Sequence, residues 1–267
     1  MNLIDQKVEF DIQNQIIGSL VLDDIKHAVF GIENVLGMMY DLIPDNKRIS
    51  YGRVHTVKLL SKYLFDKAVD PEKIKLVFDG TNNWYAKSTA LGVISYYALD
   101  DYKSYLIYFE KAAADDNWDV REMAQMFFRK LIKKYPEQIQ LYLIELTKSK
   151  NENIRRFVGE TIRPVCENGW FQEKPEYSLN ILKHLFKEKS AYPRTSVGNN
   201  LSDLARQNPE LVCKIVKDLV DSADKNSNWI AYRACRNLVK KEPERIMDLL
   251  KVDEYKYKKA KYLRNNN

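Results

Sequence analysis

The chain repeats a helix-forming pattern at intervals of 34 to 39 residues through its central and C-terminal parts. Five segments begin with polar residues suited to a helix N-cap and continue as a helix with a basic residue near its start. They are marked by Trp84, Trp118, Ile154, Pro193 and Trp229, at steps of 34, 36, 39 and 36 residues. These steps fall in or near the range of helix-pair repeats such as TPR and HEAT. Since one pair cannot bury its apolar face alone, the sequence predicts an all-α, HEAT-like helix-pair solenoid with a concave binding face.

Helix boundaries can be read from capping residues and prolines. From Trp118 to Ile132, apolar residues recur near the helical period, and Asn117 is the expected N-cap. Pro136 ends that helix and opens the next, and the same pattern recurs at Pro209 and Pro243. Each repeat is therefore a helix followed by a second, more apolar helix, and the second is expected to pack inside.

The repeat pattern does not extend through the whole chain. Residues 1–79 predict helices without a clean repeat, which favours a helical cap on repeats spanning 80–250. Residues 251–267 form a basic tail, for which a solvated, frayed end is the usual outcome. No low-complexity linker divides the chain, so we expect a single domain over 1–267.

Composition narrows the function classes without selecting one. The 267 residues carry a formal net charge of +6, which permits nucleic-acid binding but does not establish it. Three cysteines without a CxxC pattern and three scattered histidines predict no metal site, and free thiols favour a cytoplasmic location. No stretch is apolar enough to span a membrane. We expect a monomer with no cofactor and no membrane association.

Arginines and acids share helix faces in the repeat-start segments. Arg156 and Glu160 are four residues apart, and Arg163 follows three residues later. From the pattern alone, two interpretations stay open. The first is a ladder of salt bridges between repeats, which is common in solenoids. The second is a phosphate-binding groove that contains a reactive carboxylate.

Three segments in register resemble a known family. NENIRRFVGETIRP (151–164) is similar to the RR-x-x-x-E-x-x-RP signature of the AlkC branch of the AlkC/AlkD DNA alkylation repair glycosylases. WDVREMAQMFF (118–128) and RTSVGNNLSDLARQNPELV (194–212) resemble two further segments of that branch. The resemblance covers about residues 83–241. The AlkC immunoglobulin-like C-terminal domain has no counterpart in this sequence.

The resemblance implies a site and a chemistry. It implies double-stranded DNA carrying alkylated bases as the partner, and hydrolysis of 3- or 7-alkylpurine glycosidic bonds without base flipping. Glu160, Asp203 and Glu122 match the acids, with Glu160 as the main catalytic carboxylate. The DNA-backbone ligands are Arg156, Arg163 and Arg194. Trp170 is the candidate for contact with the lesion, whereas Trp118 and Trp229 are expected in the core.

The sequence departs from the AlkC pattern after Pro164, where it reads VCENGW, and at Arg233, where a histidine is usual. Two alternatives to a glycosylase therefore remain: a non-catalytic protein that binds damaged or branched DNA, and a protein-interaction scaffold. A steep salt dependence of DNA binding would separate the glycosylase and the non-catalytic DNA-binding protein from the scaffold.

Overall fold

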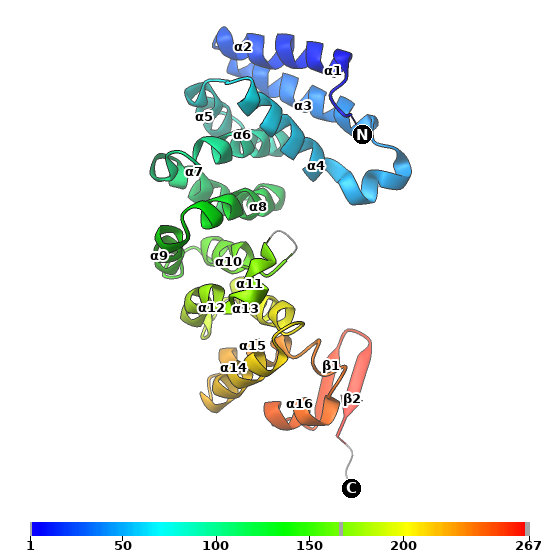
Figure 1. The fold of residues 1–267 in the computed structure, drawn as a ribbon, viewed down its shortest axis with the longest axis vertical. Helices are drawn as coiled ribbons and strands as arrows, with labels where there is room; N and C mark the ends of the chain where they lie inside the picture. Colours follow the sequence, from blue (N-terminus) through cyan, green and yellow to red (C-terminus); the bar gives the residue numbers. More distant parts are fainter. Residues whose placement is uncertain (1, 166–167, 265–267) are drawn as a thin grey trace. The chain divides into compact units, whose positions relative to one another are not determined.

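The computed structural model describes residues 2–165 and 168–264, which divide into two compact units, Met1–Lys134 and Tyr135–Asn267. Helices make up most of both units (Figure 1), as the repeat spacing predicts. The elements of the first unit are α1 (Gln6–Asp11), a π-helical turn (Ile12–Ile17), α2 (Gly18–Val21), α3 (Ile25–Asp41), α4 (Asp45–Asp66), α5 (Pro71–Asp79), α6 (Trp84–Tyr97), α7 (Tyr102–Ala113) and α8 (Trp118–Lys134).

The second unit continues the alternation and ends in two strands. Its elements are α9 (Pro136–Leu146), α10 (Glu152–Thr161), α11 (Trp170–Glu173), α12 (Pro175–Leu182), a 3-10 turn (Lys183–Leu185), α13 (Ala191–Leu204), α14 (Pro209–Asp221), α15 (Lys225–Ala234), α16 (Pro243–Leu250), β1 (Glu254–Tyr257) and β2 (Ala260–Leu263).

Each unit stacks its helices in layers. In the first unit, α6 packs against both α4 and α8, and in the second unit α13 packs against both α10 and α15. The second helices of the pairs lie beside one another as well, α9 against α12 and α14 against α16. The repeat-start helices are the more enclosed ones, because α6 and α13 bury most of their residues. The expectation that the second helix packs inside is therefore wrong.

Local signals place the helix ends where the sequence predicts them. The Asn117 side chain accepts a hydrogen bond of 2.8 Å from the Asp119 backbone N–H, and Pro136, Pro209 and Pro243 each open a helix. Close helix packing depends on small residues in the repeat-start layer. A Cβ at Gly92 of α6 would lie 2.1 Å from the Ser61 Oγ of α4, so only glycine allows this approach.

The C-terminal segment differs from the expected frayed end. Residues 254–263 form an antiparallel hairpin in which Tyr255 stands opposite Tyr262 and Lys256 opposite Lys261. Tyr255 is fully buried against the helices. Burial of Tyr255 therefore orders this segment, although its many lysines predict a solvated end.

Two tryptophans expected in the core are exposed. Trp118 keeps 54% and Trp229 keeps 36% of their surface accessible. Cys213 and Cys235 are buried free thiols, and Cys166 lies outside the described residues. Within the described ranges, no helix combines the length and hydropathy that a membrane span needs.

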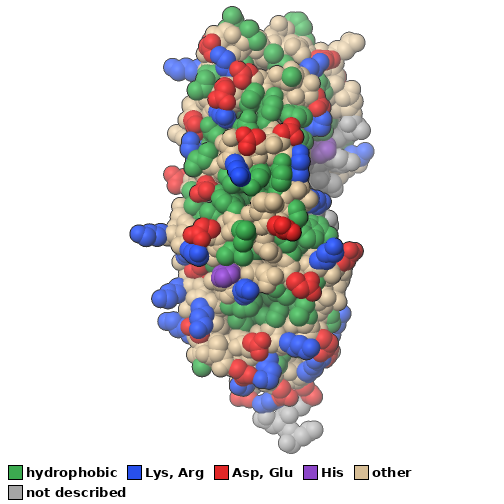
Figure 2. Space-filling model, turned by 60° about the vertical axis from the view of Figure 1, so that its left-hand side comes forward, with side chains coloured by type: hydrophobic (Ala, Val, Ile, Leu, Met, Phe, Trp, Pro, Cys, Tyr) green, Lys and Arg blue, Asp and Glu red, His purple; other side chains and the backbone are tan. Residues whose placement is uncertain are grey.

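One side of the second unit has mixed surface chemistry. Figure 2 shows the side on which Figure 1 places α9, α12 and α14, and there lysines and arginines alternate with acidic and hydrophobic side chains. Interspersed charges of both signs are typical of an ordinary solvated surface and do not favour a polyanion on this side.

Candidate nucleic-acid interface and acidic centre

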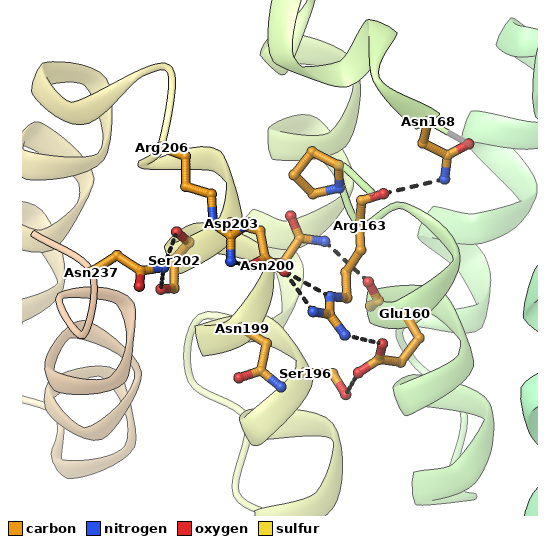
Figure 3. Close-up of polar contacts among 12 residues, drawn as sticks. Glu160, Arg163, Asn168, Ser196, Asn199, Asn200, Ser202, Asp203, Arg206 and Asn237 are labelled. Atoms are coloured by element: carbon orange, nitrogen blue, oxygen red, sulfur yellow. Dashed lines mark hydrogen bonds and ion pairs between the residues drawn. The ribbon is translucent and has the colours of Figure 1, made fainter. Parts of the chain in front are cut away.

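An acidic centre lies where the C-terminal ends of α10 and α13 come together (Figure 3). Glu160 is in the last turn of α10, and Asp203 is in the last turn of α13. Gly159 allows the two helices to approach, because a Cβ there would lie only 3.2 Å from the Ser196 Cβ. The Gly159 carbonyl accepts a 3.0 Å hydrogen bond from the Asn200 amide across the same contact. The structure thus brings together two of the three acids that the family resemblance implies.

Arg163 joins these two acids. Its Nη1 donates to Glu160 Oε2 at 2.9 Å, while its Nε and Nη2 donate to Asp203 Oδ2 at 3.1 and 2.5 Å. Ser196 Oγ donates to the other Glu160 oxygen at 2.6 Å. Arg163 therefore forms salt bridges that join one repeat to the next. Its contacts are those expected from the first interpretation of the sequence, a ladder of salt bridges between repeats.

Glu160 is ionised in this setting. The residue is buried, and burial alone would raise the pKa of its carboxyl group. The Arg163 charge, the Ser196 and Arg163 hydrogen bonds, and the nearby Arg156 charge outweigh burial and hold that pKa below its usual value. The two carboxylates thus share one guanidinium, that of Arg163, which offsets part of their negative charge.

Arginines surround the acids in excess. Arg236 Nη2 lies 3.5 Å and Arg206 Nη2 lies 3.6 Å from Asp203 Oδ1. Arg233 adds a further guanidinium beside Arg236, and burial together with that neighbour lowers the pKa of Arg233. Positive charge thus borders the two acids, and of the three arginines that pair with them only Arg163 is among the predicted DNA-backbone ligands.

A cavity of about 400 Å³ opens beside Asp203, lined by Arg163, Pro164, Val165, Gly169, Gln172, Asp203, Arg206 and Gln207. Asp203 faces this space, whereas Glu160 does not line it. A ligand in the cavity would therefore meet Asp203 and the Arg163 and Arg206 guanidiniums first.

Basic residues at the same position of the repeat-start helices α6, α10 and α13 contact the following repeat of their own unit. In the first unit, Lys87 pairs with Asp115 at 2.8 Å. In the second unit, Arg155 pairs with Glu188 at 2.7 Å, and Arg194 donates to the Asn226 side chain at 2.5 Å. These three basic residues therefore serve packing within each unit.

Arg194 also lines an open cavity of about 720 Å³ together with Lys189, Lys225 and Trp229. Its guanidinium lies 4.8 Å from the Trp229 ring centroid. Arg156 differs, because it is buried with its guanidinium 4.5 Å from the Tyr192 ring centroid. Of these two sequence-predicted phosphate ligands, Arg194 thus borders an open cavity and Arg156 is buried.

The remaining predicted site residues lie elsewhere. Glu122 belongs to the first unit, where its carboxylate accepts a 2.5 Å hydrogen bond from Gln125. Trp170 packs 4.0 Å from the Phe171 and 5.3 Å from the Tyr177 ring centroid, and its buried indole N–H has no partner among the described residues. Trp170 is thus held in an aromatic cluster of the second unit.

Sequence reasoning missed Ser196, Arg206 and Arg236 as members of the acidic centre. Arg206 stands three residues after Asp203, on the same helical face, which is a usable signal. Ser196 and Arg236 lie 36 residues from Glu160 and 33 residues from Asp203, so only their repeat position could have suggested the contacts. In the part of the chain that the structure describes, no group of three or more histidine, cysteine or acidic side chains is arranged to hold a metal ion.

The fold and the site together define a helical-repeat protein with a paired acidic centre in a cationic rim. The sequence profile of the family described as "DNA alkylation repair enzyme" matches residues 59–238. The chain therefore belongs to the DNA alkylation repair enzyme family. Both acids of the centre and all of α10, α13 and α15 lie inside the matched region.

A curated relative matches part of the chain. The uncharacterized protein YhaZ of Bacillus subtilis (strain 168) is 32% identical over 117 residues, a match that covers 42% of this chain and 32% of that protein. The chain thus matches about a third of the length of this curated relative.

Two solved structures share the fold. The alkylpurine DNA glycosylase AlkC of Pseudomonas fluorescens, solved bound to DNA containing an abasic site analog, has a TM-score of 0.54 at 20% identity, covering 84% of this chain and 56% of AlkC. AlkD2 of Streptococcus mutans has a TM-score of 0.58 at 22% identity, covering 77% of this chain and 98% of AlkD2.

Proposed function

We propose that this protein is a DNA N-glycosylase that hydrolyses the glycosidic bond of cationic 3- or 7-alkylpurines without flipping the base. The observation that carries the proposal is the ionised Glu160 carboxylate beside Asp203, inside the region that matches the DNA alkylation repair enzyme family. The structural likeness to AlkC, an alkylpurine DNA glycosylase, supports the same reaction class.

The chemistry needs little from the protein because the substrate base already carries a positive charge. When the C1′–N bond breaks, the base leaves as a neutral molecule, and no general acid is required. Positive charge develops on the sugar as an oxocarbenium ion, which the fixed carboxylates stabilise. Water then adds at C1′ and gives a proton to a carboxylate or to solvent.

Arg163 has a second role in this proposal. In the free protein its guanidinium compensates both acids, and a guanidinium binds phosphate in the same forked geometry. A DNA phosphate that draws Arg163 away would release negative charge at Asp203, next to the open cavity. Arg194 and Arg206 supply further positive charge for the DNA backbone.

A second function is favoured by a specific observation. Both acids are already satisfied by Arg163, and Glu160 does not line the cavity beside Asp203. A protein that binds damaged or branched DNA without excising bases needs no more than this, so non-catalytic binding is the alternative.

The deciding experiment measures release of free alkylpurine from methylated duplex DNA. We expect the wild type to release base and Glu160→Gln to lose about 2.7–4 kcal/mol of transition-state stabilisation, a fall of about 10²–10³ in rate. Glu152→Gln, at an exposed acid in the first turn of the same helix, is the matched control and should leave the rate unchanged.

Two further results complete the test. Asp203→Asn should also lose activity, and the double variant should lose less than the sum of the single losses, because the two acids form one charged centre. If the wild type binds methylated DNA and releases nothing, the non-catalytic alternative holds and the glycosylase proposal fails.

A further inference from the structure

The C-terminal hairpin β1–β2 has two chemically different faces. Tyr255, Tyr262 and Tyr257 lie on one face, as the register with Ala260 opposite Tyr257 requires. On the other face Lys256 stands directly opposite Lys261, and both are exposed, at 64% and 50%. The hairpin therefore has one aromatic face and one basic face.

The aromatic face fixes the hairpin on α15. The Tyr255 and Tyr232 rings stack with centroids 4.1 Å apart, and the Tyr255 hydroxyl donates to the Tyr232 backbone carbonyl at 2.7 Å. The Tyr232 hydroxyl in turn accepts from the Lys256 N–H at 2.6 Å. These contacts hold the basic face in a defined place, with its lysines directed away from the helices.

The arrangement of lysines is unfavourable for the hairpin alone. Like charges directly opposite in an antiparallel pair destabilise it. A single carboxylate, Glu254, bridges the two, 2.5 Å from Lys256 Nζ and 2.7 Å from Lys261 Nζ. The Lys256–Lys261 pair thus already accepts one anionic group between its two ammonium groups.

The turn carries two more lysines where small polar residues are favoured. Lys258 has a φ of 55°, in the left-handed region that glycine and asparagine adopt more readily, and Lys259 follows it. Both side chains are exposed. The turn thus presents two further ammonium groups to solvent next to the Lys256–Lys261 pair.

The hairpin is continuous with the acidic centre. The Arg236 guanidinium lies 5.9 Å from the Tyr257 ring centroid, and the same side chain lies 3.5 Å from Asp203. A chain of contacts therefore runs from the hairpin through Arg236 to the carboxylates, all within the second unit.

We propose that the basic face of the hairpin, Lys256, Lys258, Lys259 and Lys261, is a binding surface for the phosphate backbone of duplex DNA. It extends the contact area of the acidic centre beyond residues 59–238, where the family match ends. The inference rests on the proposed function for its ligand. Its physical basis is charge complementarity: spaced, exposed ammonium groups on a rigid platform suit successive phosphates and read no sequence.

The test is the salt dependence of binding to an unmodified duplex. Lys256→Gln/Lys261→Gln should weaken binding and flatten the plot of log K against log salt by about two units, because each lysine that no longer meets a phosphate removes about one unit. Lys258→Gln/Lys259→Gln at the turn is an independent second variant with the same expected change. Both variants leave the burial of Tyr255 and its contacts with Tyr232 in place, so the thermal midpoint should be retained.

The matched control changes the same charge elsewhere in the same unit. Lys214 and Lys217 are exposed on α14, and Lys217 is already paired with Asp221, as the hairpin lysines are with Glu254. Lys214→Gln/Lys217→Gln should leave the slope unchanged. Glu254→Gln should tighten binding, because it removes the carboxylate that competes with phosphate.

The outcomes separate this proposal from the enzymatic one. Equal losses in hairpin and control variants would show a net-charge effect, and an unchanged slope in both hairpin variants would show a structural role; either result overturns the proposal. Wild-type protein that binds duplex but releases no alkylpurine defeats only the glycosylase function. Wild-type protein that binds no duplex defeats both.

Discussion

The guanidinium of Arg163 lies 2.5 Å from the carboxylate of Asp203, forty residues further along the chain. It holds Glu160 at the same time, so one side chain ties α10 to α13 and compensates both acids. The stability of the second unit and the charge available for chemistry therefore depend on the same residue.

Arg163→Ala should destabilise the second unit. It leaves the buried Glu160 carboxylate without its main partner, and removing one partner of a buried ion pair costs about 3–5 kcal/mol. Arg163 is itself partly exposed, so we expect the lower end of that range. Urea unfolding measures the change, and Arg163→Lys, which keeps the charge without the fork, should lose less. Equal stability of the alanine variant and the wild type would contradict the bridging role.

The lowered pKa of Glu160 predicts acid sensitivity. Because the folded-state pKa lies below the usual 4.5, the ionised carboxylate stabilises the fold fully above pH 4.5. That stabilisation is lost as the pH falls through the folded-state pKa. The difference in unfolding free energy between wild type and Glu160→Gln should therefore shrink below about pH 4.5, as urea titrations from pH 3 to 7 would show. A pH-independent difference would exclude this linkage.

Arg194 and Arg156 should behave differently, although the family resemblance implies both as DNA-backbone ligands. Arg194 borders an open cavity, so Arg194→Gln should flatten the salt dependence of DNA binding by about one unit. Arg156 is buried against Tyr192, so Arg156→Gln should leave that slope unchanged and lower the thermal midpoint instead. Fluorescence anisotropy at several salt concentrations, with differential scanning calorimetry, distinguishes them. The reverse pattern would make Arg156 the phosphate ligand.

The folded structure destabilises the protonated form of the Lys130 amine on α8. Its amine lies 3.3 Å from the Tyr96 ring centroid, and burial together with Lys58 and Lys62 lowers the pKa of Lys130 from 10.5 to about 8. The unfolded chain therefore binds more protons between pH 8 and 10.5, and stability rises with pH through that window.

Lys130→Met should accordingly stabilise the first unit at pH 7, with a gain that declines as the pH rises from about 8 to 10.5. Lys133→Met, at an exposed lysine of the same helix, serves as the control and should show no such pH dependence. Thermal unfolding followed by circular dichroism across this range is sufficient. A gain that stays constant to pH 10.5 would mean that packing, rather than charge, explains the effect.

The sequence by itself determined the helical repeat, its steps and most helix ends. Those depend on local signals: apolar periodicity, the Asn117 cap, and prolines at 136, 209 and 243, each of which acts within a few residues. It also indicated Glu160 and Asp203 as members of one site, through the resemblance of residues 151–164 and 194–212 to segments of a known family.

Only the tertiary structure decided what each charged or aromatic side chain contacts. The resemblance implied both Arg156 and Arg194 as phosphate ligands, yet one is buried under an aromatic ring and the other lines a cavity. Trp229 is exposed, and Tyr255 turns a basic tail into a docked hairpin. These outcomes depend on contacts between residues that lie 20 to 40 positions apart in the sequence. The helical period determines which face of its helix a side chain occupies, but it does not determine which residue of the neighbouring repeat lies opposite.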